Sequence, residues 1–344
     1  MEYGAIDLHL RRSQVRILGE EESVVLDRRI DTTRGELHRV FAGRARMRIL
    51  IESSTESEWV AQHLEGMGHE VIVADPNYAP MYGSRSRKVK TDKRDVAALA
   101  IACRRGLYRR AHRVSAAMRT LRQQLRVRRH LVQIRSGLIS LLRAQLRHEG
   151  CRLPSGSAER VSQRLDRLAI AAALSETLAP LRTTIEQLTA TLNRLNEQVE
   201  ARAASDAVTQ QLMTAPGTGP VLALTFQAVL DDPARFGGDA SRASAFVGVV
   251  PSEDSSAERQ HKGHITKSGP RELRALLVQA SWVIWRGRSA AGAELRAWAH
   301  ALAARRGRRI AVVALARRLT RILYAMWRDR MEFGGRRRLA AAVA

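Results

Sequence analysis

The feature that most constrains the fold is a row of aliphatic residues in the middle of the chain, spaced alternately four and three residues apart. The row consists of Leu174, Leu178, Leu181, Ile185, Leu188, Leu192, Leu195 and Val199. This spacing keeps every member on one side of an α-helix for about four heptads, which is typical of a coiled coil. A second row, Leu131, Ile134, Leu138 and Leu141, repeats the spacing earlier in the chain. A turn near residues 151–157 would let the two helices pack antiparallel within one chain, and a seam between subunits is the alternative that the spacing leaves open.

The segments on either side of these helices have different patterns. The predicted strands of the first segment are 3–10, 13–18, 22–28, 46–52 and 69–75, and its predicted helices are 33–42, 57–67 and 92–105. Three strands followed by alternating helices and strands indicate an α/β unit with one mixed sheet. The last segment is predicted to be helical, with a polar loop over 252–270 and helices over 271–287 and 294–330. The sequence therefore predicts an α/β domain over 1–112, a coiled-coil region over 113–205 and an all-α domain over 206–344.

The charge of the chain is concentrated in two stripes. There are 58 basic and 34 acidic residues, a net charge of +24, and 53 of the basic residues are Arg. Residues 84–148 contribute +17 and residues 303–338 contribute +10. A solvated helix face is the ordinary explanation of a charge run, but such a face usually intersperses both signs. Two stripes of one sign, rich in guanidinium groups that suit phosphates, favour a polyanionic partner such as nucleic acid.

The composition also excludes several classes of protein. No apolar stretch approaches the ~18–20 residues of a membrane span. The two cysteines, Cys103 and Cys151, form neither a disulfide framework nor a zinc site. The first residues are strand-like and do not resemble a signal peptide. We therefore expect a protein of the reducing cytoplasm without a membrane partner.

Four carboxylates are placed to meet at one end of the predicted sheet. Asp7 lies within a strand, Glu52 ends another, and Asp92 and Asp95 share one face of the first turn of a helix. Carboxylate oxygens suit Mg²⁺, and two such ions can clamp a phosphodiester during displacement. The alternative for the helix residues is simple stabilisation of the helix N-terminus. That alternative is weaker for Asp7, because an acid inside an apolar strand is costly unless it is paired or bound to a metal.

Two segments of the last domain contain residues suited to phosphate chemistry. APGTGP at 215–220 resembles the turn of a helix-hairpin-helix, whose backbone N–H groups approach phosphates, although a plain Gly/Pro helix break explains it equally well. Ser255 and Ser256 lie in the polar loop and are followed by several cationic side chains. Such a serine can attack phosphorus while the cations stabilise the developing charge, although loop serines are more often plain polar surface.

Several motifs, taken in order, resemble the DEDD transposases of insertion sequences, which are recombinases guided by a bridge RNA. They are GAIDLH, ILIESSTESEW, HEVIVADPNYAPMY, RKVKTDKRDVAALA, APGTGPVLA and FVGVVPSEDSS, followed by KGHITKSGPRELR. The most specific of them are KTDKRD and HITKSGPRELR. The resemblance covers most of the chain, and the helical middle matches only in character.

The resemblance implies an RNase H-type, RuvC-like first domain in which Asp7, Glu52, Asp92 and Asp95 bind Mg²⁺ or Mn²⁺. It implies a C-terminal transposase domain in which Ser256 attacks a DNA phosphate and forms a transient phosphoserine link. The implied partners are donor and target DNA, a structured guide RNA, and further copies of the chain in a dimer or a tetramer. The implied setting is the bacterial or archaeal cytoplasm, at the nucleoid. We expect nucleic-acid contacts from Arg85, Arg87, Lys88, Lys90, Lys93, Gly217, Gly219, Arg259, Lys262, Lys267 and Arg271.

The chain departs from the family pattern at two places. Ala257 follows the serine where the family usually has Gly, which removes the freedom to adopt a positive φ, and the neighbouring Ser255 is an alternative nucleophile. The segment after Glu52 lacks a Gly that is common at that point. Two other functions compete with recombination. One is a RuvC-like two-metal DNA junction nuclease in which the serine has no part, and the other is a catalytically decayed protein that only binds nucleic acid.

Overall fold

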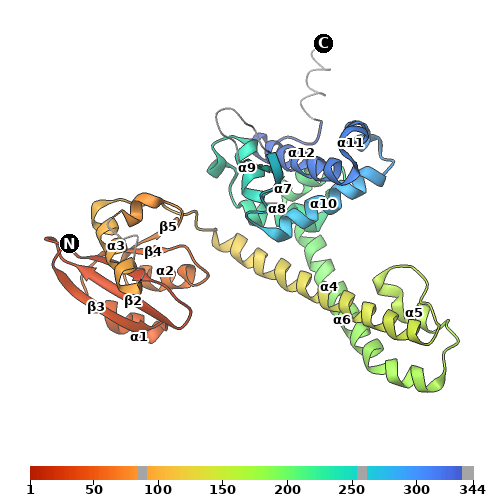
Figure 1. Ribbon diagram of the computed structural model, residues 1–344, viewed down its shortest axis with the longest axis horizontal. Coiled ribbons are helices and arrows are strands. Elements are labelled where there is room, and N and C mark those ends of the chain that lie inside the picture. Colours follow the sequence, from red (N-terminus) through yellow and green to blue (C-terminus); the bar gives the residue numbers. More distant parts are fainter. Residues whose placement is uncertain (84–90, 254–261, 335–344) are drawn as a thin grey trace, which may run out of the picture. The chain divides into compact units, whose positions relative to one another are not determined.

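The computed structural model describes residues 1–83, 91–253 and 262–334 of the chain (Figure 1). The chain forms two compact units, Met1–Arg113 and Val114–Ala344. The first unit ends one residue after the α/β domain that the sequence predicts. The predicted coiled-coil region and the predicted C-terminal domain lie together in the second unit, so their separation at residue 205 stays a prediction.

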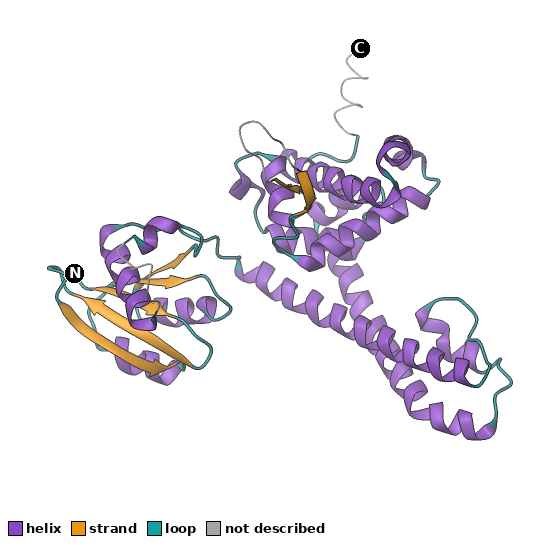
Figure 2. Cartoon of the chain, viewed as in Figure 1, coloured by secondary structure: helices purple, strands orange, loops and turns teal. Residues whose placement is uncertain are grey.

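Among the described residues of the first unit, five strands form one mixed sheet in the order β3-β2-β1-β4-β5 (Figure 2). They are β1 (Tyr3–Asp7), β2 (Arg12–Leu18), β3 (Val24–Asp31), β4 (Arg48–Glu52) and β5 (Glu70–Ala74). β2 pairs antiparallel with β1 and β3, whereas β4 pairs parallel with β1 and β5. The prediction of one mixed sheet is confirmed, and the arrangement is compatible with an RNase H-like domain.

Each face of this sheet is covered by its own helices. The helices are α1 (Arg34–Phe41), α2 (Ser57–Glu65) and α3 (Asp92–Arg105), with a 3₁₀ turn η1 (Ala79–Tyr82). Successive strand residues point to opposite faces. Ile6 and Ile49 therefore pack in the cluster that contains residues of α1 and α2, whereas Ala5 and Leu50 pack with residues of α3. α3 is thus held against β1 on the face opposite to the other two helices.

Two long helices of the second unit pack along each other. They are α4 (Ala116–His148) and α6 (Ala172–Ser205), and the connection contains η2 (Ala158–Arg160) and α5 (Val161–Leu165). Arg128 Nε donates to Asn196 Oδ1 at 2.7 Å, and Arg135 Nη1 donates to Thr189 Oγ1 at 3.4 Å. Residues later in α4 therefore contact residues earlier in α6, so the two helices run antiparallel within one chain. This is the first of the two arrangements that the heptad spacing allows.

The packed face of α4 matches only part of the row that the sequence predicts, because Leu138 packs against the buried cluster and Leu131 is half-buried. The buried aliphatic residues of α4 are Leu121, Leu125, Ile139, Leu142 and Leu146. Ile134 and Leu141 of the predicted row are instead 42% and 45% exposed. The packed row also has heptad spacing, but it passes through Arg128 and Arg135, and these charges hide it from a search for aliphatic residues. On α6 the predicted row does pack, with Leu178, Ile185 and Leu192 buried.

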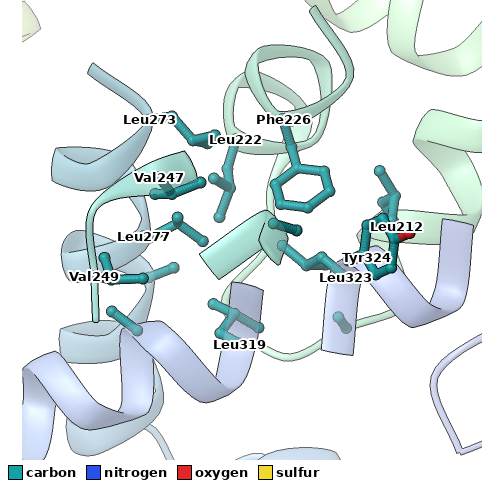
Figure 3. Close-up of a cluster of buried hydrophobic side chains, with 14 of the residues drawn as sticks. Leu212, Leu222, Phe226, Val247, Val249, Leu273, Leu277, Leu319, Leu323 and Tyr324 are labelled. Atoms are coloured by element: carbon teal, nitrogen blue, oxygen red, sulfur yellow. The ribbon is translucent and has the colours of Figure 1, made fainter. Parts of the chain in front are cut away.

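The rest of the second unit is a helical core, part of which is shown in Figure 3. Its elements are α7 (Ala207–Met213), α8 (Pro220–Leu230), η3 (Pro233–Phe236), α9 (Ala240–Val247), β6 (Pro251–Glu253), β7 (Lys262–Ile265), α10 (Arg271–Arg286), η4 (Ala290–Gly292), α11 (Ala293–Arg306) and α12 (Arg308–Asp329). Phe226, Leu319 and Tyr324 are fully buried in this core, and Tyr324 Oη donates to the carbonyl oxygen of Pro233 at 2.9 Å.

The sequence misses two details of this core. β6 and β7 form a short antiparallel pair where a loop is predicted, because three or four polar residues give too weak a strand pattern. The helix predicted over 294–330 is broken at Gly307, whose φ of 84° and ψ of 153° are not helical. None of the helices in the described part of the chain combines the length and apolarity needed to cross a bilayer.

Candidate metal centre and nucleic-acid interface

Asp7 and Glu52 lie side by side at the carboxyl ends of neighbouring parallel strands. β1 and β4 pair with Ile6 opposite Ile51, so the next residue on each strand is an acid. The side chain of Asp7 is only 13% exposed. Tyr82 donates its hydroxyl proton to Glu52 Oε1. The parallel register thus brings two of the four predicted carboxylates together at one edge of the sheet.

The first turn of α3 supplies the other two carboxylates. Thr91 caps this helix, because its Oγ1 accepts a hydrogen bond from the backbone N–H of Arg94 at 3.4 Å. Asp92 and Asp95 follow in the first turn, where negative charge is favourable. Asp95 is buried at 7% exposure, and Asp92 is half-buried. Stabilisation of the helix start accounts for an acid at these positions, but it does not account for the convergence with acids of the sheet.

His9 joins this cluster, although the sequence reasoning missed it. Its Nε2 lies 3.5 Å from Asp7 Oδ2 and 3.8 Å from Asp92 Oδ1. One ligand atom from each of these three residues lies within 4.8 Å of the others. The signal was present in the sequence, because His9 follows Asp7 by two residues and such residues share a face of an extended chain.

The electrostatics of Asp7 show how closely the acids act on one another. Burial raises the pKa of the Asp7 carboxyl, the positive charge of His9 lowers it, and the charges of Glu52, Asp92 and Asp95 raise it further. The net direction is upward. An ionised Asp7 is therefore held at a cost, which a bound cation would relieve.

This donor set fits a divalent cation. Carboxylate oxygens are the hard ligands that Mg²⁺ and Mn²⁺ accept, and imidazole suits Mn²⁺ as well. In the described residues, the group of Asp7, His9 and Asp92 brings three ligand atoms within reach of one ion. Glu52 and Asp95 lie close enough to raise the pKa of Asp7. The chemistry that the arrangement supports is the binding of a metal beside a phosphate.

A polar hollow adjoins the carboxylates. It has a volume of about 570 Å³ and is lined by Gln14, Asp27, Arg28, Arg29, Thr91, Asp92 and Lys93. Arg29 Nη2 lies 3.8 Å from Asp92 Oδ2. Cations and acids thus meet at this hollow, and Lys93 of the expected nucleic-acid contacts lies there. Arg85, Arg87, Lys88 and Lys90 fall outside the described residues.

The glycines of the 215–220 segment line a second hollow. Gly217 and Gly219 precede α8 and face residues of α10, including Trp282 and Arg286, around a volume of about 770 Å³. Gly217 has a φ of 73°, and a Cβ built on it would lie 2.7 Å from the carbonyl oxygen of Ala280. The close approach of this turn to α10 therefore requires glycine at 217, whereas no atom lies within 4 Å of a Cβ built on Gly219.

The remaining predicted residues lie around β6 and β7. Ser255, Ser256, Ala257 and Arg259 fall outside the described residues, and Lys262 begins β7. Lys267 has a φ of 55° in the turn that follows β7. Arg271 begins α10 and lines a hollow of about 230 Å³ together with Arg122 and Arg126 of α4. Glu272 also lines this hollow, and the Arg122 guanidinium donates to the carbonyl oxygens of Ala228 and Val229. The three arginines still leave the lining positive, which suits an anionic ligand.

Two family models match the chain in different places. A model of IS110-type DEDD transposases, described as transposase, matches residues 5–149. A model described as the transposase IS116/IS110/IS902 family matches residues 209–295. The four acids lie within the first match, and Gly217, Gly219 and Ser256 lie within the second. Together the two models cover two thirds of the chain.

Curated relatives are similar to this chain along most of their length. The "Probable family 20 transposase" of Pseudomonas aeruginosa is 26% identical over 93% of this chain and 95% of its own length. The transposase for insertion sequence element IS1111A of Coxiella burnetii is 28% identical over 76% of this chain and 72% of its own. The transposase for insertion sequence element IS1328 of Yersinia enterocolitica is 26% identical over 81% of this chain and 83% of its own length. With both family models, these similarities show that the chain belongs to the IS110/IS116 family of DEDD transposases.

Proposed function

We propose that this transposase cuts and rejoins the DNA of an insertion sequence through a covalent phosphoserine intermediate, guided by a structured RNA. The observation that carries the proposal is the convergence of four carboxylates from β1, β4 and α3 within the unit that the DEDD model matches. Membership of the family implies DNA substrates and a divalent metal. The RNA, the serine and the identity of the metal as Mg²⁺ or Mn²⁺ belong to the proposal.

Asp7, Glu52, Asp92 and Asp95 would hold the divalent ion, whose charge stabilises phosphate oxygens during displacement. Asp95 is buried and the side chain of Asp7 is only 13% exposed, so these two would fix the position of the site. Asp92 is more open and lies beside Arg29, at the hollow where a phosphate could approach. Tyr82 holds one oxygen of Glu52 and thereby orients its carboxylate.

Ser256 is the proposed nucleophile. Its Oγ forms a bond to phosphorus while the bond between phosphorus and one deoxyribose oxygen breaks. The serine gives up its proton, and the departing oxygen takes one up to become a hydroxyl. The hydroxyl of another DNA end then reverses both changes and releases the serine. Lys262, Lys267 and Arg271 follow in the sequence and are proposed to neutralise the phosphate.

The proposed nucleic-acid partners account for the charge of the chain. The two basic stripes contribute +17 and +10, and most of their basic residues are Arg. The affinity for RNA and DNA should therefore fall steeply with salt, because each neutralised phosphate releases condensed counterions. A flat dependence of affinity on salt would contradict the nucleic-acid proposal as a whole. Assembly into a dimer, and into a tetramer on DNA, is part of the same proposal.

A denaturing gel can test the proposed reaction. The full chain, with the RNA that co-purifies with it, is incubated with a divalent ion and labelled donor and target DNA. Wild type, Ser256→Ala, Ser255→Ala and Asp92→Ala are compared. We expect a covalent protein–DNA band that disappears in Ser256→Ala and Asp92→Ala but persists in Ser255→Ala.

The other outcomes separate the competing functions. Cleavage without a covalent band, lost only in Asp92→Ala, indicates a metal-dependent nuclease and refutes the serine mechanism. Binding without any cleavage indicates a decayed protein. Digestion of the RNA before incubation tests guidance, because an RNA-guided reaction stops and an RNA-independent one continues.

A further inference from the structure

We propose that His9 is a fifth residue of the metal centre, whose imidazole nitrogen binds the divalent ion directly and makes the site favour Mn²⁺ over Mg²⁺. The inference rests on the metal site of the proposed function and adds a ligand of a different chemical kind. It is carried by the group of Asp7, His9 and Asp92, whose ligand atoms lie within 4.8 Å of one another.

The backbone of His9 is held on both sides. Its N–H donates to Ser13 Oγ at 3.3 Å, and its carbonyl oxygen accepts from Thr32 Oγ1 at 2.8 Å. The hydroxyl groups of Ser13 and Thr32 are themselves 2.7 Å apart, and Ser13 is fully buried. β1 has ended by this point, so these hydroxyls replace the ladder of the sheet. They fix the position from which the imidazole reaches back to the carboxylates.

The distances around Nε2 match those between ligands of one ion. An octahedral ion with ligands at about 2.1 Å keeps neighbouring ligand atoms about 3 Å apart and opposite ones about 4 Å apart. Nε2 lies 3.5 Å from Asp7 Oδ2 and 3.8 Å from Asp92 Oδ1. Small side-chain rotations would bring all three atoms to an ion. The His9 side chain is 52% exposed, so it has room for them.

A second role for His9 must be separated from this one. A protonated imidazole could serve only as a counter-charge for Asp7 and Asp92. The two roles have opposite consequences for metal affinity. Removing a ligand weakens binding, whereas removing a cation that competes with the metal leaves binding unchanged or strengthens it.

The nitrogen ligand also changes the metal preference. Mg²⁺ favours a shell of oxygen atoms, whereas imidazole is a common ligand of first-row transition metals. A site with four carboxylates and one imidazole should therefore lose more affinity for Mn²⁺ than for Mg²⁺ when the imidazole is removed. The difference between the two losses is the signature of direct ligation.

The test is spectroscopic and uses the full chain without DNA. Pulsed EPR of the Mn²⁺-loaded protein detects nitrogen nuclei bound to the ion. Mn²⁺ affinity is measured from the EPR signal of free Mn²⁺, and Mg²⁺ affinity by competition. The variants are His9→Ala, His9→Asn and the control His38→Ala, which removes an exposed imidazole on α1. Thermal unfolding of each variant verifies the fold.

We expect nitrogen modulation in wild type and His38→Ala and none in the two His9 variants. We expect the Mn²⁺ dissociation constant to rise at least about tenfold in those variants, and that of Mg²⁺ less than about threefold. Bound Mn²⁺ without nitrogen modulation in wild type would overturn the proposal, and this result needs no variant to fold. Unchanged or tighter Mn²⁺ binding in His9→Ala would also overturn it, in favour of a counter-charge. Failure of wild type to bind Mn²⁺ at all would overturn the metal site itself.

Discussion

Replacement of Gly217 by alanine should lower the melting temperature of the protein, whereas the same change at Gly219 should leave it nearly unchanged. Both glycines line the hollow between α8 and α10. Gly217 has a φ of 73°, and its added Cβ would lie 2.7 Å from the carbonyl oxygen of Ala280 and 3.0 Å from Ile284 Cγ1. Gly219 has a φ of −99°, and no atom lies within 4 Å of its added Cβ.

The magnitude follows from two separate costs. A left-handed backbone costs a residue with a Cβ about 1–2 kcal/mol. Forcing a methyl group against the backbone of α10 adds about 1–3 kcal/mol, because that backbone is part of a packed helix. A loss of about 2–5 kcal/mol in a unit of this size lowers the melting temperature by about 5–15 °C. At Gly219 only the helix N-cap preference is affected, at about 1 kcal/mol or less.

Thermal unfolding followed by circular dichroism measures the stability effect. Fluorescence anisotropy with a labelled duplex, at a temperature where both variants are folded, measures affinity. If the turn grips phosphates, Gly219→Ala should weaken affinity without loss of stability, because its methyl group enters the hollow in front of the α8 amides. Normal affinity in this variant would make the segment a plain helix break. A Gly217→Ala protein that melts at the wild-type temperature would refute the reasoning about the close helix approach.

Three further effects follow from buried or partly buried polar groups. Burial raises the pKa of the Cys103 thiol from 9.0 to about 12. A thiol-alkylating reagent at pH 8 should therefore modify the native protein at Cys151 alone, which mass spectrometry can measure. Because the unfolded thiol ionises first as pH rises, urea titrations should show the free energy of unfolding falling above about pH 9. Arg135→Met should leave the urea midpoint unchanged or raise it, whereas Glu159→Ala should destabilise by about 1–3 kcal/mol, because it leaves a buried charge without its partner. Arg113→Ala should destabilise the first unit by about 1–3 kcal/mol in the same assay, since its guanidinium donates to two carboxylates.

The sequence was sufficient for the parts of the site that depend on strand order. Glu52 was predicted at the end of a strand and Asp7 inside a strand over 3–10, which the structure ends at Asp7. Parallel pairing of these two strands brings the acids together. Asp92 and Asp95 follow a recognisable N-cap, so their helix turn was also predictable. Their convergence was predicted because adjacent strands and one helix start can bring acids to the same end of a sheet.

Other parts of the fold depend on contacts that no local pattern reveals. The backbone of His9 is fixed by Ser13 and Thr32, and the latter lies 23 residues away in the sequence. The face of α4 was predicted only in part, because Arg135 lies on the packed face, where an aliphatic residue is usual. Its burial depends on Glu159 and Thr189, which come from two later segments.

The buried guanidinium of Arg135 also determines how the long α4–α6 hairpin can respond to force. Sliding one helix past the other by a heptad would shift it about 10 Å. The shift would carry Arg135 away from Thr189 and Glu159 and leave its buried charge without its carboxylate partner, at a cost of several kcal/mol. Arg135 Nε has no hydrogen-bond partner among the described residues. Loss of the remaining hydrogen bonds of this guanidinium would leave still more of its buried N–H groups without partners. The hairpin therefore has one register, and a pull at one end is transmitted along it instead of being dissipated by slippage.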